Sequence, residues 1–330
     1  MKDVAKRVGV SVQTVSAVIN QKEGITAKTR ERVLQAVAEL NYRPYSVARS
    51  LRTGQSHTLA LLITDIANPY LASIVSTAEE YAYQHGYTLT VYNTHDDPQR
   101  EAAYIQTAAQ RWIDGVIFIS TEDSGSNLSA LRDAGIPSVA FERIPEEHTG
   151  PAITLDNQQT GYMATRHLLS LGHRQIAHIS GPLSLGVARD RVNGYKRALA
   201  ESGIDIDRGR IAEGRWDCES GEEAIQQILR TGTPFTALFA ANDRVAIGAM
   251  SVLHTRGITI PDDVSVIGVD DIEVAAYQIP ALTTLRQPFD QLAIHAVRLL
   301  LELIEGYEIK EQHLVLEPEL ILRQSTKPVD

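Results

Sequence analysis

The first twenty residues, Met1–Asn20, read MKDVAKRVGVSVQTVSAVIN and predict two short helices separated by a tight turn. The first helix has apolar residues with the spacing of one helix face, namely Val4, Ala5 and Val8. Ser11 ends the turn, where an N-cap residue precedes an apolar-periodic run. Two helices joined this closely form a helix-turn-helix, a unit that fits the DNA major groove.

The second predicted helix runs from Val12 to Asn20. At about 100° per residue, its apolar arc contains Val15, Val18 and Ile19, which are expected to pack on the first helix. The opposite side carries small or polar residues, namely Val12, Gln13, Ser16 and Ala17. Helical geometry alone leaves two possibilities for this side, a solvated face or a surface that contacts a partner.

The stretches KDVAKRVGVS, TVS and VIN resemble the DNA-binding headpiece of the lactose/galactose-repressor (LacI/GalR) family. The similarity continues through a predicted third helix at Thr26–Asn41 and then Tyr42–Pro44. It reaches Val47–Leu51, which is similar to the hinge helix of that family, and it extends along nearly the whole chain.

The resemblance implies a homodimer that binds double-stranded operator DNA of near-palindromic sequence. The residues implied to contact base edges are Val12, Gln13 and Ala17, of which Gln13 suits adenine. The residues implied to hold phosphates and set the register are Ser11, Thr14, Ser16 and Asn20. In the hinge, Leu51 is implied to insert into the minor groove, with Arg52 reaching nearby phosphate or groove edge.

Charge is distributed unevenly along the 330 residues. The net charge of −10 by itself argues against DNA binding. Residues 1–56, however, carry ten Lys and Arg against four Asp and Glu, whereas the remainder carries 21 against 37. A basic head on an acidic body is expected when one end alone meets phosphate.

Composition indicates a cytoplasmic protein without membrane association or enzymatic activity. No apolar run approaches the roughly 18 residues of a membrane span, and the N-terminus lacks the apolar region of a signal peptide. Cys218 is the single cysteine, which suits a reducing compartment. The sequence contains no Gly-rich phosphate loop, metal-spaced His/Cys cluster or nucleophile elbow, so no catalytic residue, cofactor or metal site is predicted.

From His57 onwards, strand-like apolar runs alternate with helical stretches. The strands predicted in the first half are Leu59–Ile63, Thr88–Tyr92, Val116–Ile119, Ser138–Phe141 and Ile153–Leu155. The rhythm restarts with Ile176–Ile179, Ala237–Ala240 and Val264–Val269. This alternation predicts an α/β fold with parallel sheets covered by helices on both faces, and the number of units favours two doubly wound halves.

The predicted chain is therefore multi-domain. An all-α headpiece spans 1–45, a hinge helix and linker span 46–56, and an effector-binding and dimerisation core spans 57–330. The hinge is too short to be helical alone and is expected to order only on DNA.

The family resemblance implies a type I periplasmic-binding-protein core of two subdomains. The three crossings between them are expected near Asp156, near Arg286–Phe289 and near His313–Val315. The first subdomain then comprises 57–156 and 287–313, and the second comprises 157–286 and 315–330.

Ligands of such folds bind beyond the carboxyl ends of the strands. The polar and aromatic side chains there suit a sugar, because Trp stacks on its apolar face while carboxylate, amide and Arg groups match its hydroxyls. In the monosaccharide binders of the family, the matching positions carry the sugar, and here they are Asn68, Tyr70, Leu71, Glu142, Arg143, Arg189, Trp216, Asn242, Asp270 and Gln287. Arg191, by contrast, is expected to be a structural partner of its loop.

Two of these positions depart from the family pattern. Glu142 replaces the more usual Asp, and Leu71 stands where pentose and hexose binders often carry a second aromatic ring. Leu185 and Val187 stand where the purine-responsive branch uses polar groups, which argues against a purine effector.

The sequence thus predicts a repressor of a carbohydrate-catabolic operon that a small sugar releases from its operator. The alternatives are a regulator controlled by a corepressor or a protein partner, an enzyme on the same scaffold, and a sugar-binding protein without a DNA role. The last of these does not need residues 1–56.

Overall fold

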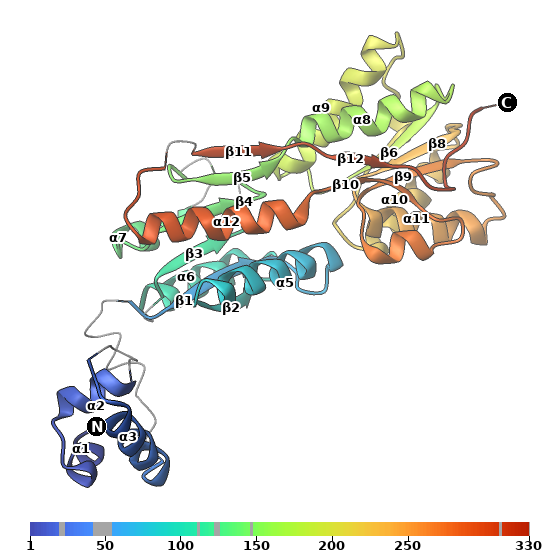
Figure 1. Cartoon of the computed structure of the whole chain (residues 1–330). Coiled ribbons are helices and arrows are strands. Elements are labelled where there is room, and N and C mark those ends of the chain that lie inside the picture. The colour runs from blue at the N-terminus through green and yellow to red at the C-terminus, as the bar shows by residue number, and fades with distance from the viewer. Residues whose placement is uncertain are drawn as a thin grey trace. The chain divides into compact units, whose positions relative to one another are not determined.

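The computed structural model describes residues 1–19, 24–41, 55–110, 113–121, 126–145, 148–309 and 312–329. The chain divides into two compact units, Met1–Ser56 and His57–Asp330 (Figure 1). Asn20, Leu51 and Arg52, which were expected to contact DNA, lie outside the described residues, as does most of the expected hinge.

The described residues of the first unit form the helices α1 (Lys2–Val8), α2 (Val12–Ile19) and α3 (Ala27–Glu39). Its core is small and joins all three helices through residues that include Val4, Val15 and Val33, each with no exposed surface. The apolar faces predicted for α1 and α2 are confirmed. Ser11 caps α2, because its Oγ accepts the backbone N–H of Thr14 at 3.1 Å.

The second unit contains two six-stranded sheets. The first has the order β11-β5-β4-β3-β1-β2 and consists of β1 (Thr58–Ile63), β2 (Thr88–Asn93), β3 (Gly115–Phe118), β4 (Ser138–Phe141), β5 (Ala152–Leu155) and β11 (His313–Leu316). The second has the order β12-β10-β9-β8-β6-β7 and consists of β6 (Ile176–Ser180), β7 (Ile211–Glu213), β8 (Ala237–Ala240), β9 (Ser265–Asp270), β10 (Thr283–Arg286) and β12 (Glu319–Ile321). Only the β10–β12 pair is antiparallel among these neighbours, so the predicted pair of doubly wound sheets is confirmed.

Helices cover both faces of each sheet. Packed on the first sheet are α5 (Pro69–Gln84), α6 (Pro98–Gln110), α7 (Ser129–Asp133), which follows the short helix η1 (Ser126–Leu128), and α12 (Phe289–Ile304). Packed on the second are α8 (Asn157–Ser170), α9 (Gly186–Glu201), α10 (Cys218–Thr231) and α11 (Asp243–Thr255). Successive residues of β1 alternate between the two faces, since Leu61 packs in the α5/α12 core and Leu62 in the α6/α7 core.

The chain passes between the two sheets three times, at Asp156, at 287–288 and at 317–318. The third crossing was expected earlier, at His313–Val315. That expectation is wrong, because all four residues of β11 pair in parallel with β5 and belong to the first sheet.

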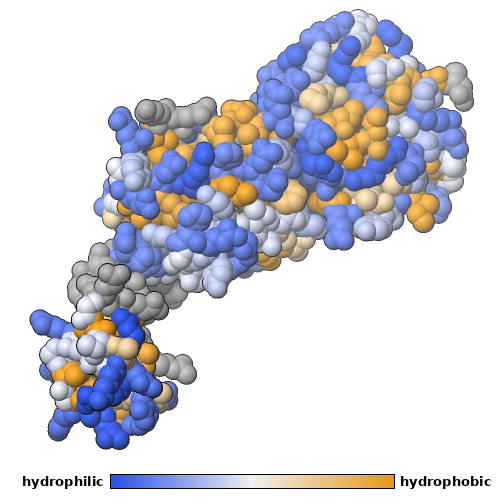
Figure 2. All heavy atoms as spheres, in the orientation of Figure 1, coloured by the Kyte–Doolittle hydropathy of each residue, from blue (hydrophilic) through white to orange (hydrophobic). Residues whose placement is uncertain are grey.

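The visible face of the second unit is mostly hydrophilic, with hydrophobic patches between the polar residues (Figure 2). The remaining short helices of this unit are η2 (Arg208–Arg210) and η3 (Glu273–Tyr277). Large exposed apolar side chains include Tyr277 of η3 and Ile279 just after it, which is 97% exposed. Within the described ranges, no helix has both the length and the apolar character needed to cross a membrane.

Helices α8 and α9 approach each other at two glycines. A Cβ atom on Gly161 would collide with the backbone carbonyl oxygen of Arg191, and one on Gly194 would collide with that of Gln158. This close approach places Asn157, at the start of α8, beside the Arg191 side chain of α9.

We expect Gly161→Ala to lower the free energy of unfolding by about 1–3 kcal/mol, because the added methyl meets rigid backbone. The matched control is Gln158→Ala, an exposed position on the same helix, which should change stability by less than about 0.5 kcal/mol. Urea-induced unfolding followed by circular dichroism measures both. Equal stability of the two variants would contradict the role of the glycine contact.

Candidate functional site

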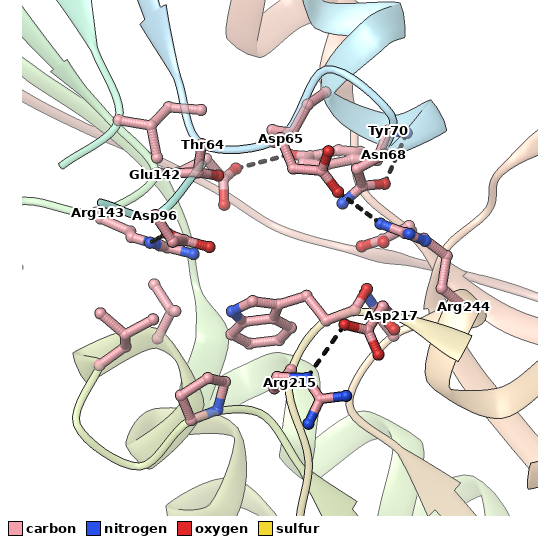
Figure 3. A pocket seen from close by; sticks show the side chains of 18 of the residues that line it. Thr64, Asp65, Asn68, Tyr70, Asp96, Glu142, Arg143, Arg215, Asp217 and Arg244 are labelled. Atoms are coloured by element: carbon pink, nitrogen blue, oxygen red, sulfur yellow. Dashed lines mark hydrogen bonds and ion pairs between the residues drawn. The ribbon is translucent and has the colours of Figure 1, made fainter. Parts of the chain in front are cut away.

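A cavity of about 440 Å³ lies between the two sheets of the second unit (Figure 3). Its walls come mainly from segments that directly follow strands, such as Thr64 and Asp65 after β1 and Asn242 after β8. In doubly wound sheets these carboxyl ends are the positions where ligands bind. Both sheets contribute, so a ligand in the cavity would contact both subdomains.

The cavity contains nine of the ten residues predicted from the sequence as effector contacts. They are Asn68, Tyr70, Leu71, Glu142, Arg143, Trp216, Asn242, Asp270 and Gln287. Leu185 and Val187 also line it, so part of one wall is apolar.

Arg189 is the exception, since it does not line the cavity. Its side chain is exposed, and its Nη1 donates to the backbone carbonyls of Leu183 and Ser184 at 3.1 and 2.7 Å. Two residues along a helix differ by about 200° in direction. Arg191 therefore points the other way, is buried and lines the cavity.

Arg191 makes the structural contacts that the sequence predicted for it, but it also faces the cavity. Its Nε donates to Asn157 Oδ1 at 2.9 Å, and its Nη1 donates to the carbonyl of Ala241 at 2.6 Å. Its guanidinium carbon lies 5.7 Å from the centre of the Trp216 ring. The two hydrogen-bond acceptors are neutral, so they leave the charge of the guanidinium uncompensated.

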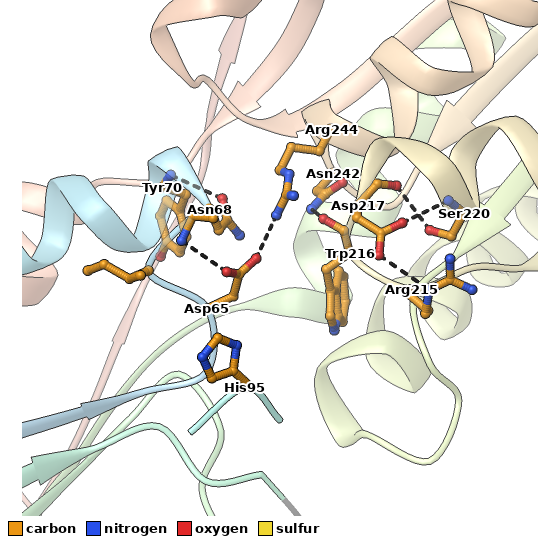
Figure 4. Close-up of polar contacts among 12 residues, drawn as sticks. Asp65, Asn68, Tyr70, His95, Arg215, Trp216, Asp217, Ser220, Asn242 and Arg244 are labelled. Atoms are coloured by element: carbon orange, nitrogen blue, oxygen red, sulfur yellow. Dashed lines mark hydrogen bonds and ion pairs between the residues drawn. The ribbon is translucent and has the colours of Figure 1, made fainter. Parts of the chain in front are cut away.

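Three other arginines at the cavity are paired with carboxylates. Arg143 contacts Asp96 at 2.6 Å, and Arg215 contacts Asp217 at 3.2 Å. Arg244 of α11 contacts Asp65, in the loop after β1, at 2.9 Å (Figure 4). This last ion pair joins the two subdomains across the cavity.

Four buried side chains form a polar chain between the two subdomains. Tyr70 Oη lies 2.6 Å from Glu142 Oε1 and 3.0 Å from Gln287 Oε1. Gln287 Nε2 donates to Asp270 Oδ1 at 2.6 Å. Gln287 is one of the residues where the chain crosses between the sheets, so this chain of contacts joins elements of both subdomains.

Burial dominates the titration of these acidic groups. It raises the pKa of Glu142, against the opposing effects of the Tyr70 hydrogen bond and of Arg191. It also raises the pKa of Asp270 to about 7, although nearby Arg191 and the hydrogen bond from Gln287 oppose the shift. Burial and the charge of Glu142 together raise the pKa of Tyr70 well above its usual value, so its hydroxyl keeps its proton.

Backbone strain is concentrated at the cavity. His95, Asp96, Glu142 and Asp270 line it and have positive φ angles of 56°, 53°, 62° and 116°. Residues other than glycine rarely adopt such angles, and where they do they cluster at functional sites.

Two buried polar atoms of cavity residues lack a hydrogen-bond partner in the part of the chain that the structure describes. They are the indole Nε1 of Trp216 and the Oγ1 of Thr121. An unpaired buried polar group costs about 1–3 kcal/mol, which a ligand with matching polar atoms would recover. The cavity is thus suited to a molecule that has an apolar face and several hydrogen-bonding groups. The described residues contain no cluster of His, Cys, Asp and Glu arranged to hold a metal ion.

Sequence reasoning missed several cavity residues, among them His95, Asp96, Thr121 and Arg244. His95 and Asp96 follow β2, so the rule that ligands bind beyond carboxyl ends of strands would have found them. Arg244 lies in the first turn of α11, and its role depends on its contact with Asp65, far away in sequence.

The predicted DNA-reading side of α2 faces outward from the small core of the first unit. Val12 is 41% exposed and Gln13 is exposed, whereas Ser16 and Ala17 are partly buried. Val15 and Val18 face inward, as the periodicity predicted. The outward face therefore presents a mixture of one amide and small side chains.

Comparisons with known proteins agree with this architecture in both units. Residues 1–45 match bacterial regulatory proteins of the lacI family, and residues 56–317 match the periplasmic binding proteins and sugar-binding domain of the LacI family. The transcriptional repressor PurR of Vibrio atlanticus (strain LGP32) is 37% identical, with 100% of this chain and 99% of PurR covered.

The solved structures of two regulators are similar to this chain over almost its whole length. The lac repressor dimer bound to operator and the anti-inducer ONPF matches with a TM-score of 0.89 and 31% identity, covering 98% of each chain. The transcriptional regulator CelR in complex with cellobiose matches with a TM-score of 0.76 and 31% identity, also covering 98% of each chain.

The helix-turn-helix unit and the two-sheet core together define a DNA-binding transcriptional regulator with a ligand-binding domain. The chain belongs to the LacI family of bacterial regulatory proteins. Its relatives are transcriptional repressors, and the chain is accordingly a regulator rather than an enzyme.

We expect Arg191→Met to lower the free energy of unfolding by about 2 kcal/mol or more, because it leaves the buried acceptors on Asn157 and Ala241 without a donor. The matched control, Arg189→Met, changes an exposed side chain and should cost less than about 1 kcal/mol. Urea unfolding compares the two. A larger loss in the Arg189 variant would refute the assignment of Arg191 as the buried organising group.

Proposed function

We propose that this protein is a repressor of a carbohydrate-catabolic operon and that a small uncharged sugar, or a derivative of one, releases it from a palindromic operator. The single observation that carries the proposal is the balance of charge and polar groups in the cavity between the sheets. The DNA-binding and regulatory parts of the proposal follow from the membership of the chain in the LacI family.

The charge balance favours an uncharged effector. Arg143, Arg215 and Arg244 are each held by a carboxylate, so they do not offer a free cation to a phosphate or a carboxylate ligand. The remaining guanidinium, that of Arg191, faces the carboxyl groups of Glu142 and Asp270, and its charge acts to lower the pKa of both. An anionic ligand would meet an excess of acidic groups in this cavity.

The polar groups favour hydroxyls. The Trp216 ring offers a flat apolar surface, and its Nε1 offers a donor. Asn68 and Asp270 add an amide and a carboxyl group around the same cavity. Sugar hydroxyls both donate and accept hydrogen bonds, so they match such a mixed set. The relative CelR, solved with cellobiose, supports a carbohydrate ligand for this arrangement.

We assign the parts of the chain as follows. Residues 1–45 contact DNA, with Gln13 reading a base edge and Ser11, Thr14 and Ser16 near phosphates. Residues 46–56, with Leu51 and Arg52, link this unit to the rest of the chain and contribute to operator binding. Residues 57–330 bind the effector and form a homodimer in the cytoplasm, and the exposed apolar side chains at Tyr277 and Ile279 support such an interface.

A thermal-shift screen tests the effector class. Neutral pentoses and hexoses, their acid and phosphate derivatives, and purine bases are each added to the full chain, since a ligand stabilises by RT ln(1 + [L]/Kd). We expect a shift with at least one neutral sugar. Purines are the second candidate, because a relative along the whole chain is the repressor PurR, and a shift with a purine alone would overturn the sugar proposal.

We expect Trp216→Ala to abolish the thermal shift produced by the effector, because it removes the stacking surface and the free indole donor. Arg189→Ala is the control and should keep the full shift, since Arg189 lies outside the cavity. An undiminished response in the Trp216 variant would mean that the ligand binds elsewhere.

We expect Gln13→Ala to weaken operator binding by about 1–3 kcal/mol, because it removes a base-edge contact from the outward face of α2. Gln35→Ala changes an exposed glutamine of α3 in the same unit and should leave operator affinity unchanged. Fluorescence anisotropy with labelled operator DNA measures both. Equal losses in the two variants would contradict the assignment of α2 as the reading helix.

A further inference from the structure

The distances within the polar chain Glu142–Tyr70–Gln287–Asp270 determine how many protons its contacts require. Its three contacts, at 2.6, 3.0 and 2.6 Å, are all within hydrogen-bond distance. All four side chains are at least nine-tenths buried, and these distances leave no room for a water molecule within any of the three contacts. Each contact therefore needs one proton of its own between its two heavy atoms.

The four side chains supply too few protons when both acids are ionised. The Tyr70 hydroxyl has one proton and can serve one of its two contacts. The Gln287 amide donates on its nitrogen side only, so it serves one contact as well. Three contacts and two donors leave one contact between two oxygens without a proton. A carboxyl proton on Glu142 or Asp270 provides the third donor.

Two arrangements satisfy all three contacts, and each needs this proton. In the first, Glu142 donates to Tyr70 Oη, Tyr70 donates to Gln287 Oε1, and Gln287 Nε2 donates to Asp270. In the second, the Gln287 amide is turned over, since its oxygen and nitrogen are interchangeable in shape. Asp270 then donates to Gln287, Gln287 donates to Tyr70, and Tyr70 donates to Glu142.

The surrounding charges agree with one proton rather than none or two. The charged groups facing the pair are Arg191, Arg143 with its partner Asp96, Arg244 with its partner Asp65, and Asp243, whose oxygens accept from Thr284 Oγ1 and the Ile272 amide. Burial and the charge of Asp270 raise the pKa of Asp243 well above its usual value, so Asp243 keeps a proton of its own and adds no charge. With Arg143 and Arg244 paired, one positive charge on Arg191 faces the two remaining acids, Glu142 and Asp270. One proton on those acids leaves a single negative charge opposite Arg191, which makes this part of the cavity neutral.

We infer that the floor of the cavity holds one carboxyl proton shared between Glu142 and Asp270, passed along Tyr70 and Gln287. The inference rests on the proposed function for its consequence, namely that the proton keeps the site neutral and so suited to an uncharged effector. Glu142 is essential to it, because its side chain reaches the Tyr70 hydroxyl. The raised pKa values of both acids have the direction that a retained proton requires.

Infrared spectroscopy of the ligand-free full chain tests the inference directly. The wild-type protein should show the carbonyl band of a protonated carboxyl group near neutral pH. Glu142→Gln and Asp270→Asn should each lower the carboxyl absorption by one group, because the added amide supplies the missing donor without a titratable proton. The absorption of Asp243, whose pKa burial also raises, remains in both variants. Asp243→Asn is the matched control, since Asp243 lies outside the chain, and the shared-proton band should persist in it.

Thermal unfolding gives a second readout that does not depend on the infrared band. An acid whose pKa is raised on folding stabilises the native state at low pH, and this stabilisation is lost as pH rises through the native pKa, here about 7 for Asp270. The melting temperature of the wild type should fall between about pH 5 and about pH 8. The fall should be smaller in both amide variants.

Carboxyl absorption that is missing from the wild type, or that is as strong in either amide variant as in the wild type, would overturn the shared proton. Equal pH dependence of the melting temperature in wild type and both variants would do the same. These measurements use no ligand, so they stand apart from the sugar screen. A failed screen would refute the effector class and leave the proton assignment intact.

Discussion

A positive charge buried in the wall of the cavity constrains the arrangement around it. The Arg191 guanidinium is 4% exposed, and such a group is stable only with hydrogen-bond acceptors and compensating negative charge. Asn157 and the Ala241 carbonyl supply the acceptors. Glu142 and Asp270, one from each subdomain, provide the acidic groups that face it. The cavity therefore depends on both sheets keeping their positions around the Arg191 side chain.

Local features of the fold meet this constraint. Glycines at 161 and 194 let α8 and α9 approach closely enough for Asn157 to reach Arg191. Gln287 lies in a segment that crosses between the sheets, and there it contacts Tyr70. The ion pair between Asp65 and Arg244 is a second contact between the two subdomains. A ligand that fits between the halves must interact with both, which is the geometry that a change of domain closure requires.

Most of the fold was predictable, because buried parallel strands appear as short apolar runs between helical stretches. The third crossing was not, since His313–Leu316 has the pattern of any strand and its partner β5 is far away in sequence. Nine cavity residues followed from family resemblance and strand ends. The choice between Arg189 and Arg191 depended on where α9 begins, and the Tyr70–Gln287 contact spans 217 residues, so neither is visible in local sequence.

We propose that one chain links an operator-binding headpiece to a sugar-binding cavity and that sugar binding releases the DNA. Linkage requires that each ligand weaken the other by the same factor. The most direct measurement is the dissociation constant of the effector for free protein and for protein saturated with operator DNA. The account predicts weaker binding to the DNA complex, by a factor of about 5 to 150. Equal constants, or tighter binding to the DNA complex, would contradict it.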